Sequence, residues 1–137
     1  MTFEIMRKLL GLILIFAVSL FGCKESDIEK SINDDYYVKY HFYADGYNYV
    51  YFDIIYLNSV TSNSNPAINT DSYKGYKSFE NEKICGPFKK GDKVSIEMSN
   101  ETGVVNRLLE IYVSKNNSPF ALRKSTSSKK LEYTIDY

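Results

Sequence analysis

Short segments in which apolar and polar residues alternate recur through the chain after Cys23. An apolar residue at every second position is typical of a β-strand that buries one face, and Val38, Tyr40 and Phe42 follow this pattern in residues 36–43. Further strands are predicted in residues 47–57, 94–98, 104–114, 120–124 and 131–135, with weaker signals in 73–79 and 83–88. No segment after Cys23 has a sustained apolar period of about 3.6 residues, so we expect almost no helix there. The sequence therefore predicts an all-β fold of seven or eight short strands in an antiparallel two-sheet sandwich.

The length of 137 residues fits one domain preceded by a leader and a tether. Residues 1–22 predict the leader, and residues 23–35 are mostly charged or polar without a usable period, which indicates a flexible tether. Residues 36–137 remain, close to the size of about 100 residues that is typical of an immunoglobulin-like domain. We therefore predict an immunoglobulin-like β-sandwich over residues 36–137.

The first two predicted strands are joined at Ala44-Asp45-Gly46. A two-residue turn would place the polar face of one strand beside the apolar face of the other. A three-residue loop instead pairs Tyr40 with Val50 and keeps one face apolar, with Gly46 in the left-handed conformation that such loops need. The sequence therefore predicts a hairpin here.

Polar segments separate the remaining strands. Residues 59–72 are rich in Ser, Asn and Thr, and predict a long surface loop that can include a short edge strand. Turns are expected at residues 89–92, 100–103 and 116–119, and a polar connection at 125–130.

Residues 1–22 have the features of a helical secretory signal peptide. Arg7 and Lys8 precede the apolar run Leu9–Gly22, which ends at Cys23. At a rise of about 1.5 Å per residue this run reaches roughly 21 Å, whereas a hydrocarbon core is about 30 Å thick. The run is therefore too short to span a bilayer.

The junction Leu20-Phe21-Gly22-Cys23 resembles the lipobox of bacterial lipoproteins. Residues 24–29 are similar to the export tract of Bacteroidota surface lipoproteins. The stretch that runs from residues 86–92 through residues 111–113 to the terminal strand resembles small Bacteroidota lipoproteins with immunoglobulin-like domains in its succession of turns and strands. The resemblance implies that Cys23 is acylated, and that membrane lipid is the partner of this anchor. More than one acyl chain is needed for stable anchoring. It also implies an exported protein anchored to the cell envelope, in the outer membrane and exposed at the surface; a lipoprotein facing the periplasm is the alternative.

Acylation of Cys23 leaves Cys85 without a partner for an internal disulfide. The alternative is a signal cleaved elsewhere, which frees Cys23 to pair with Cys85. A catalytic Cys85 would need a base beside it, and the single histidine, His41, is far away in the sequence. Since free cysteines are usually buried as small hydrophobic residues, we favour a structural role for Cys85.

The sequence offers little for catalysis or for metal binding. It contains no nucleophile-elbow, zinc-protease or phosphate-loop motif, no zinc-ligand spacing and no calcium loop. The spacing does not select a catalytic pair among Asp53, Glu80, Glu82 and Glu110. We therefore predict no enzymatic activity, no catalytic residue, no metal and no cofactor.

The charges are balanced, with 17 Lys and Arg against 17 Asp and Glu. Nucleic-acid-binding proteins usually have a clear excess of basic residues, so we predict no nucleic-acid partner.

Tyrosine is abundant, with 13 residues that all follow the leader. The predicted hairpin gathers several of them on its outward face, with the cross-strand pairs Tyr43–Tyr47, His41–Tyr49 and Lys39–Tyr51. The candidate ligand-binding residues are Tyr37, Lys39, His41, Tyr43, Tyr47, Tyr49 and Tyr51. Such a face suits a glycan or protein ligand, because each ring offers apolar area and a hydrogen-bonding tip. The alternative is ordinary strand composition, since tyrosine is favoured in sheets.

These features together predict a cell-envelope lipoprotein that acts as a non-catalytic binding module. The alternative within this class is a structural or accessory subunit of an envelope assembly, with contact through a sheet edge by strand addition. A small hydrolase or an enzyme inhibitor is the alternative of another class.

Overall fold

A computed structural model describes residues 34–60 and 66–137. These residues form strands and connections without a helix, which confirms the all-β prediction. The predicted signal peptide, Cys23 and the tether up to residue 33 lie outside the described residues.

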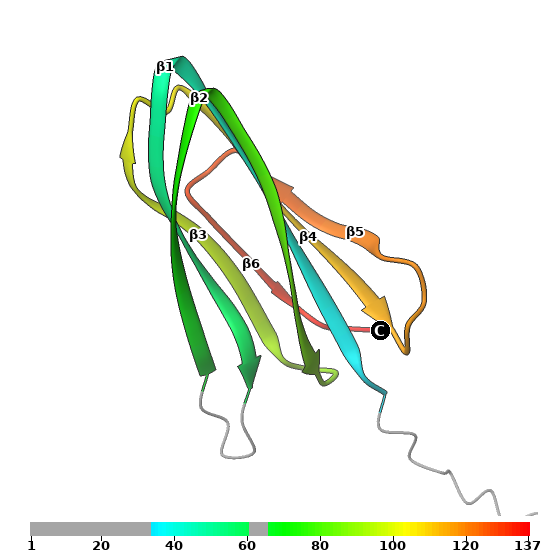
Figure 1. Cartoon of the computed structure of the whole chain (residues 1–137). Coiled ribbons are helices and arrows are strands. Elements are labelled where there is room, and N and C mark those ends of the chain that lie inside the picture. Colours follow the sequence, from blue (N-terminus) through cyan, green and yellow to red (C-terminus); the bar gives the residue numbers. More distant parts are fainter. Residues whose placement is uncertain (1–33, 61–65) are drawn as a thin grey trace, which may run out of the picture. The chain divides into compact units, whose positions relative to one another are not determined.

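The strands form one antiparallel sheet (Figure 1). They are β1 Tyr36–Val60, β2 Pro66–Phe88, β3 Lys93–Thr102, β4 Asn106–Lys115, β5 Ala121–Thr126 and β6 Lys130–Thr134. The order is β5-β4-β1-β3-β6, and β2 pairs with β1 along nearly its whole length. On its other edge, β1 pairs first with β4, over residues 36–45, and later with β3, over residues 51–56.

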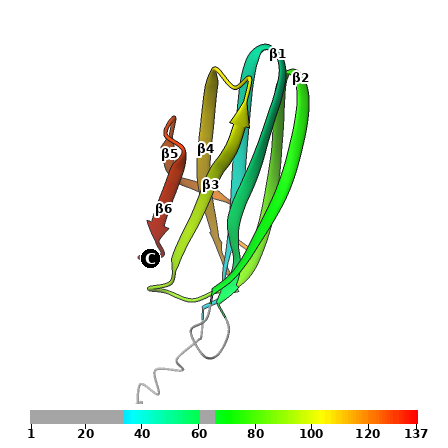
Figure 2. The same ribbon diagram turned by 90° about the vertical axis from the view of Figure 1, so that its left-hand side faces the viewer.

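The long hairpin of β1 and β2 bends at its middle, where both ribbons curve over (Figures 1 and 2). The register between the strands shifts between Asp45 and Tyr49, and Lys77 opposite has a positive φ of 65°. The connection from β3 to β4 crosses β1 at this point, where the Val105 amide donates to the Asp45 carbonyl at 2.7 Å. We call this region the bend. It curls the sheet until β5 and β6, at the two ends of the strand order, lie side by side, so that the sheet is nearly closed into a barrel.

Two glycines make the close crossing at the bend possible. A Cβ atom on Gly46 would lie 1.9 Å from the Gly103 carbonyl oxygen, and a Cβ atom on Gly103 would lie 2.2 Å from the Tyr49 carbonyl oxygen. Gly103 also has a φ of 75°, which favours glycine. Only residues without side chains therefore fit where the two backbones cross.

The core lies on the concave side of the curled sheet. Alternate residues of β1 face inward from Tyr36 to Ala44, and again from Val50 to Tyr56. Rings from both sides of the bend meet here: Phe42 and Phe52 pack at 6.3 Å, and Tyr73 lies 4.9 Å from Phe79. The buried hydrophobic side chains are Tyr36, Val38, Tyr40, Phe42, Ala44, Val50, Phe52, Ile54, Tyr56, Leu57, Cys85, Phe88, Val94, Ile96, Met98, Leu109, Ile111, Val113, Leu131 and Ile135.

The later part of the chain agrees with the sequence prediction. Leu109, Ile111 and Val113 are fully buried in β4, and Val94, Ile96 and Met98 are fully buried in β3. The turn at residues 89–92 and the hairpin between β4 and β5 are also present. Alternation predicts β3 and β4 well because each of these two strands has one buried face.

The structure corrects two predictions about the earlier part. Residues 44–46 do not form a hairpin, because β1 continues through them as part of the bend. Residues 66–72, predicted as part of a long surface loop that can include a short edge strand, are the start of the 23-residue edge strand β2, where Ile68 pairs with Leu57 and Thr70 with Ile55. This part of β2 is polar because most of it is exposed at the edge of the sheet. The weak signals in 73–79 and 83–88 belong to this same strand, and the six observed strands do not confirm the seven or eight predicted.

Candidate functional site

The predicted ligand-binding face is divided by the bend. Tyr37, Lys39, His41 and Tyr43 lie on the outward side of β1 between β2 and β4, whereas the three other tyrosines lie in or beyond the bend. The predicted pairs Tyr43–Tyr47, His41–Tyr49 and Lys39–Tyr51 are wrong. They are replaced by other pairs, such as His41 with Glu82 and Glu110, Tyr49 with Tyr76, and Tyr51 with Lys74.

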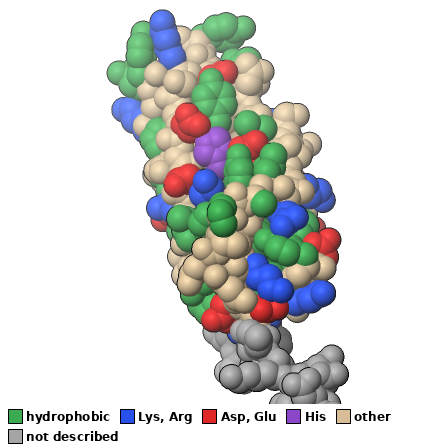
Figure 3. Space-filling view, turned by 90° about the vertical axis from the view of Figure 1, so that its right-hand side faces the viewer, with side chains coloured by type: hydrophobic (Ala, Val, Ile, Leu, Met, Phe, Trp, Pro, Cys, Tyr) green, Lys and Arg blue, Asp and Glu red, His purple; other side chains and the backbone are tan. Residues whose placement is uncertain are grey.

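His41 lies between two carboxylates on its outward face, where Figure 3 shows it in purple with acidic side chains around it. Its Nε2 atom lies 2.7 Å from Oε1 of Glu80 on β2, and its Nδ1 atom lies 2.9 Å from Oε2 of Glu110 on β4. A neutral imidazole has a single N–H, so only the doubly protonated ring can donate to both carboxylates. His41 thus connects three neighbouring strands.

The other polar groups of this face are also paired with one another. The Lys39 ammonium lies 3.4 Å from Glu82 and 4.7 Å from the centroid of the Tyr112 ring. The Tyr112 hydroxyl donates to Glu110 at 2.9 Å, which raises the pKa of Tyr112. These contacts pair polar groups of β1, β2 and β4 with one another, and they leave none of these groups as a free nucleophile.

The carboxylates considered for catalysis do not form a catalytic pair. Glu80 and Glu110 are separated by the His41 ring. Asp53 lies beyond the bend, where the Ser72 hydroxyl and the Asn100 amide donate to it and lower its pKa. Each of these carboxylates therefore has a structural partner.

A second outward surface lies at the bend, and we call it the tyrosine patch: Tyr47, Tyr49, Tyr51 and Tyr76 with Lys74 and Lys77. The exposed fractions of the four tyrosines are 83%, 50%, 41% and 61% respectively. The ring centroids of Tyr49 and Tyr76 are 5.3 Å apart, and those of Tyr49 and Tyr51 are 6.3 Å apart. Exposed aromatic rings thus gather on one pair of hydrogen-bonded strands.

The lysines of the tyrosine patch lie over its rings. The Lys74 ammonium is 4.8 Å from the centroid of Tyr49 and 5.2 Å from that of Tyr51, and Lys77 lies 5.6 Å from Tyr76. Sequence reasoning missed Lys74, Tyr76 and Lys77 because residues 73–79 gave only a weak strand signal. The alternation of Tyr73 and Phe79 inward with Tyr76 outward becomes readable only when β2 is placed beside β1.

Cys85 and His41 are not brought together. Cys85 faces the core opposite Val38 with 6% of its surface exposed, whereas His41 faces outward. Burial raises the pKa of Cys85 to about 11, so the protonated thiol predominates at neutral pH. This supports the predicted structural role for Cys85.

A polar cluster joins the two parts of β2 across the concave side of the bend. The Asp71 carboxylate accepts hydrogen bonds from the Lys83 ammonium at 2.9 Å, from the Tyr56 hydroxyl at 3.1 Å and from the Tyr73 hydroxyl at 3.3 Å. The Lys83 ammonium is the main cause of a lowered pKa for Asp71, and it has a raised pKa itself. The cluster stabilises the bend.

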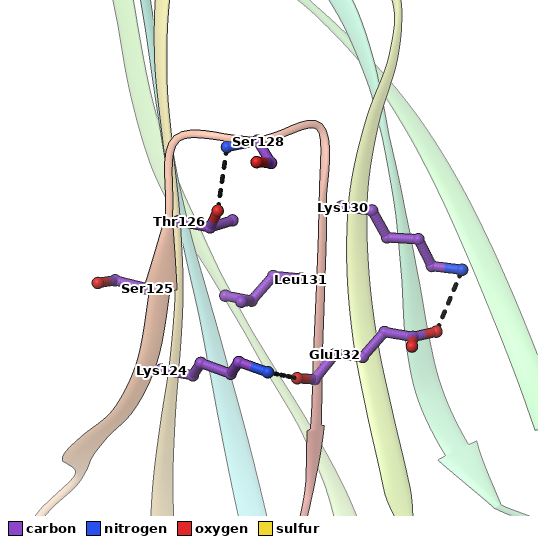
Figure 4. Close-up of a pocket in the computed structure, with 7 residues that line it drawn as sticks. All are labelled: Lys124, Ser125, Thr126, Ser128, Lys130, Leu131 and Glu132. Carbon is purple, nitrogen blue, oxygen red and sulfur yellow. Dashed lines mark hydrogen bonds and ion pairs between the residues drawn. The ribbon is translucent and has the colours of Figure 1, made fainter.

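An open depression of about 380 Å³ lies between β5 and β6, where the sheet is nearly closed (Figure 4). The Lys124 ammonium crosses it and donates to the Glu132 carbonyl at 2.9 Å. The Glu132 carboxylate is neutralised by Lys130 at 3.1 Å and by Lys93 at 3.0 Å. These contacts brace two adjacent strands and leave no acid–base pair aimed into the depression.

Residues 34–60 and 66–137 contain no group of three His, Cys, Asp or Glu side chains that is placed to hold a metal ion. These ranges also contain no helix with the length and apolar character needed to cross a membrane. Comparisons with protein-family models, with curated proteins and with solved structures find no match to this chain.

Proposed function

We propose that this chain is a lipid-anchored, non-catalytic binding module of the bacterial cell envelope, which contacts its ligand through the tyrosine patch. The single observation that carries the binding role is the gathering of four exposed tyrosines on two paired strands at the bend. Exposed large apolar groups that lie side by side mark interaction surfaces, whereas isolated ones do not.

The anchor rests on Cys23 and the preceding lipobox-like residues. Replacing Cys23 with Ser removes the sulfur that receives lipid, so the chain should move from the membrane fraction to the soluble fraction. Cys85→Ser is the matched control, because this thiol is buried, and this variant should stay with the membrane. Equal membrane association of both variants would contradict acylation of Cys23.

The binding role is tested by the triple variant Tyr49→Ser, Tyr51→Ser and Tyr76→Ser. The side chains are largely exposed, so their loss should leave the fold intact and abolish retention on glycan and protein arrays. Ile84→Ser is the matched control, since Ile84 is exposed on β2 away from the bend. Unchanged retention by a folded triple variant would exclude the tyrosine patch as the binding surface.

The absence of catalysis is supported by how the reactive groups are held. His41 is occupied by two carboxylates on the outward face, and Cys85 lies in the core as a protonated thiol. A hydrolase would need a nucleophile and a base within hydrogen-bond reach of each other.

We also propose that the domain is an immunoglobulin-like sandwich of two layers. If the parts of β1 and β2 on either side of the bend are counted separately, the six strands become eight segments. Segments with β4 and β5 would form one layer, and those with β3 and β6 the other.

The edge of β2 favours a second candidate function, an accessory subunit that accepts a strand from a partner. Among the described strands β2 pairs only with β1, which leaves 23 residues along an edge. Charged residues such as Lys77, Glu80 and Glu82 on this edge are of the kind that opposes strand addition, so the tyrosine patch is favoured. A partner that copurifies stoichiometrically with the tagged chain, and that the triple tyrosine variant retains, would reverse this preference.

A further inference from the structure

We propose that the tyrosine patch recognises an acidic glycan, meaning a saccharide chain that carries carboxylate or sulfate groups. This inference rests on the proposed binding function and names the chemical class of its ligand. It is carried by exposed aromatic rings and by two ammonium groups that lie over them and form no ion pair among the described residues.

The rings supply flat apolar surfaces with polar rims. The centroids of Tyr49 and Tyr51 are 6.3 Å apart with their planes at 42°, and Tyr76 lies at the edge of Tyr49 at 63°. A sugar ring presents C–H groups on its faces and hydroxyls around its perimeter. It therefore matches a tyrosine, whose face is electron-rich and whose hydroxyl donates and accepts hydrogen bonds.

The ammonium groups supply the charge preference. Seven other lysines form ion pairs with carboxylates, but neither Lys74 nor Lys77 does so among the described residues. The nearby Asp53 carboxylate is already engaged by the Ser72 hydroxyl and by Asn100. Both lysines therefore remain available to an anion.

The position of Lys74 couples the two kinds of contact. Its ammonium lies over both Tyr49 and Tyr51, and such cation–π contacts favour one placement of an otherwise flexible side chain. A saccharide unit that rests on these rings brings its acidic group next to a positioned cation. Less conformational entropy is then lost when the ligand binds.

Two other macromolecular ligands fit the patch less well. The centres of protein–protein interfaces are depleted in lysine, whereas here Lys74 lies over both Tyr49 and Tyr51. Surfaces that insert into membranes present Trp, Phe or Leu, whereas the exposed apolar groups of the patch are all tyrosines. The combination of tyrosine and unpaired lysine is better matched by a polar, anionic, elongated chain.

The inference is tested with the full-length chain that carries Cys23→Ser, so that acylation does not contribute to binding. Affinity electrophoresis compares polymers with the same backbone and different charge: carboxymethyl cellulose with hydroxyethyl cellulose, and dextran sulfate with dextran. We expect retardation by a charged polymer, none by its neutral counterpart, and weaker retardation as salt is raised. The carboxylated and sulfated polymers distinguish the two sources of negative charge.

Variants separate the patch from general charge attraction. Tyr49→Ser with Tyr76→Ser should weaken binding about tenfold, and Lys74→Gln about twofold to fivefold. Lys90→Gln is the charge-matched control, because Lys90 is exposed in the turn between β2 and β3, and it should bind as the parent does. An equal loss in Lys74→Gln and Lys90→Gln would overturn the inference.

The remaining outcomes distinguish this inference from the proposed function. Patch-dependent binding to neutral polymers, to proteins on an array or to phosphatidylglycerol vesicles, without binding to the acidic polymers, would overturn the acidic-glycan inference and leave the binding module standing. If none of these probes binds in a manner that depends on Tyr49 and Tyr76, both proposals fail.

Discussion

Replacing Gly46 with Ala tests the bend, on which the placement of both outward surfaces depends. The new Cβ atom would lie 1.9 Å from the Gly103 carbonyl oxygen, far inside the distance at which such atoms meet. Gly103 cannot retreat freely, because a Cβ atom placed on it would lie 2.2 Å from the Tyr49 carbonyl oxygen, which shows how closely its backbone packs against β1. One of the two backbones must therefore move.

The magnitude follows from what this movement disrupts. Separating the crossing backbones lengthens the hydrogen bond from the Val105 amide to the Asp45 carbonyl, worth about 1 kcal/mol. Residual overpacking adds about 1–3 kcal/mol. Ala also lowers the conformational entropy of the unfolded chain, which offsets about 0.4–1 kcal/mol of this loss of stability. We expect Gly46→Ala to lower the free energy of unfolding by about 1–3.6 kcal/mol, centred a little above 2.

The assay is urea unfolding followed by far-UV circular dichroism, with Gly91→Ala as the control. A Cβ atom on Gly91 has no heavy atom within 4 Å, so Gly91→Ala introduces only the strain of a positive φ of 91°. This strain should lower the free energy of unfolding by about 1 kcal/mol. The hairpin predicted from sequence would make Gly46 a similar, open, left-handed glycine. A loss in Gly46→Ala no greater than that in Gly91→Ala, or a gain in stability, would therefore refute the crossing at the bend.

Three further predictions concern the polar groups. The Lys83 ammonium lowers the pKa of folded Asp71 below 3.8, so the ionised carboxylate stabilises the fold above that pH and this stabilisation is lost as the pH falls through the folded pKa. Asp71→Asn should therefore lower the midpoint of urea unfolding at pH 7 and match the parent in strong acid. A difference that stays constant across pH would contradict this. Because burial raises the pKa of Cys85 to about 11, iodoacetamide should alkylate this thiol slowly at pH 8 and much faster in urea. Peptide mass spectrometry measures both rates, and equal rates would show an exposed thiol. His41→Leu removes the donor to Glu110 and should lower the free energy of urea unfolding by about 1–2 kcal/mol. Adding Glu110→Gln to this variant should restore part of the lost stability. If no stability is restored, the loss comes from packing.

Much of the core could be predicted from sequence because alternation survives the bend. The inward residues Phe42 and Phe52 are separated by an even number of positions, so both face the core whether the chain reverses in a hairpin or continues through a bulge. Burial alone therefore could not distinguish the two topologies. What distinguishes them is the partner of β1, and the polar residues of β2 gave too weak a strand signal to identify it.

The candidate site could be predicted only in part, for the same reason. Tyr49 and Tyr51 were identified as outward residues, and they remain so, because facing outward is a property of one strand. Their neighbours are a property of register: the predicted hairpin placed His41 beside Tyr49, whereas β2 places Tyr76 there and Lys74 beside Tyr51. The exchange changes the chemistry of the surface, since a histidine that can pair with carboxylates is replaced by cations without acidic partners. The preference for an anionic ligand thus arises from the pairing of β1 with β2, and it would be lost if the first two predicted strands paired with each other.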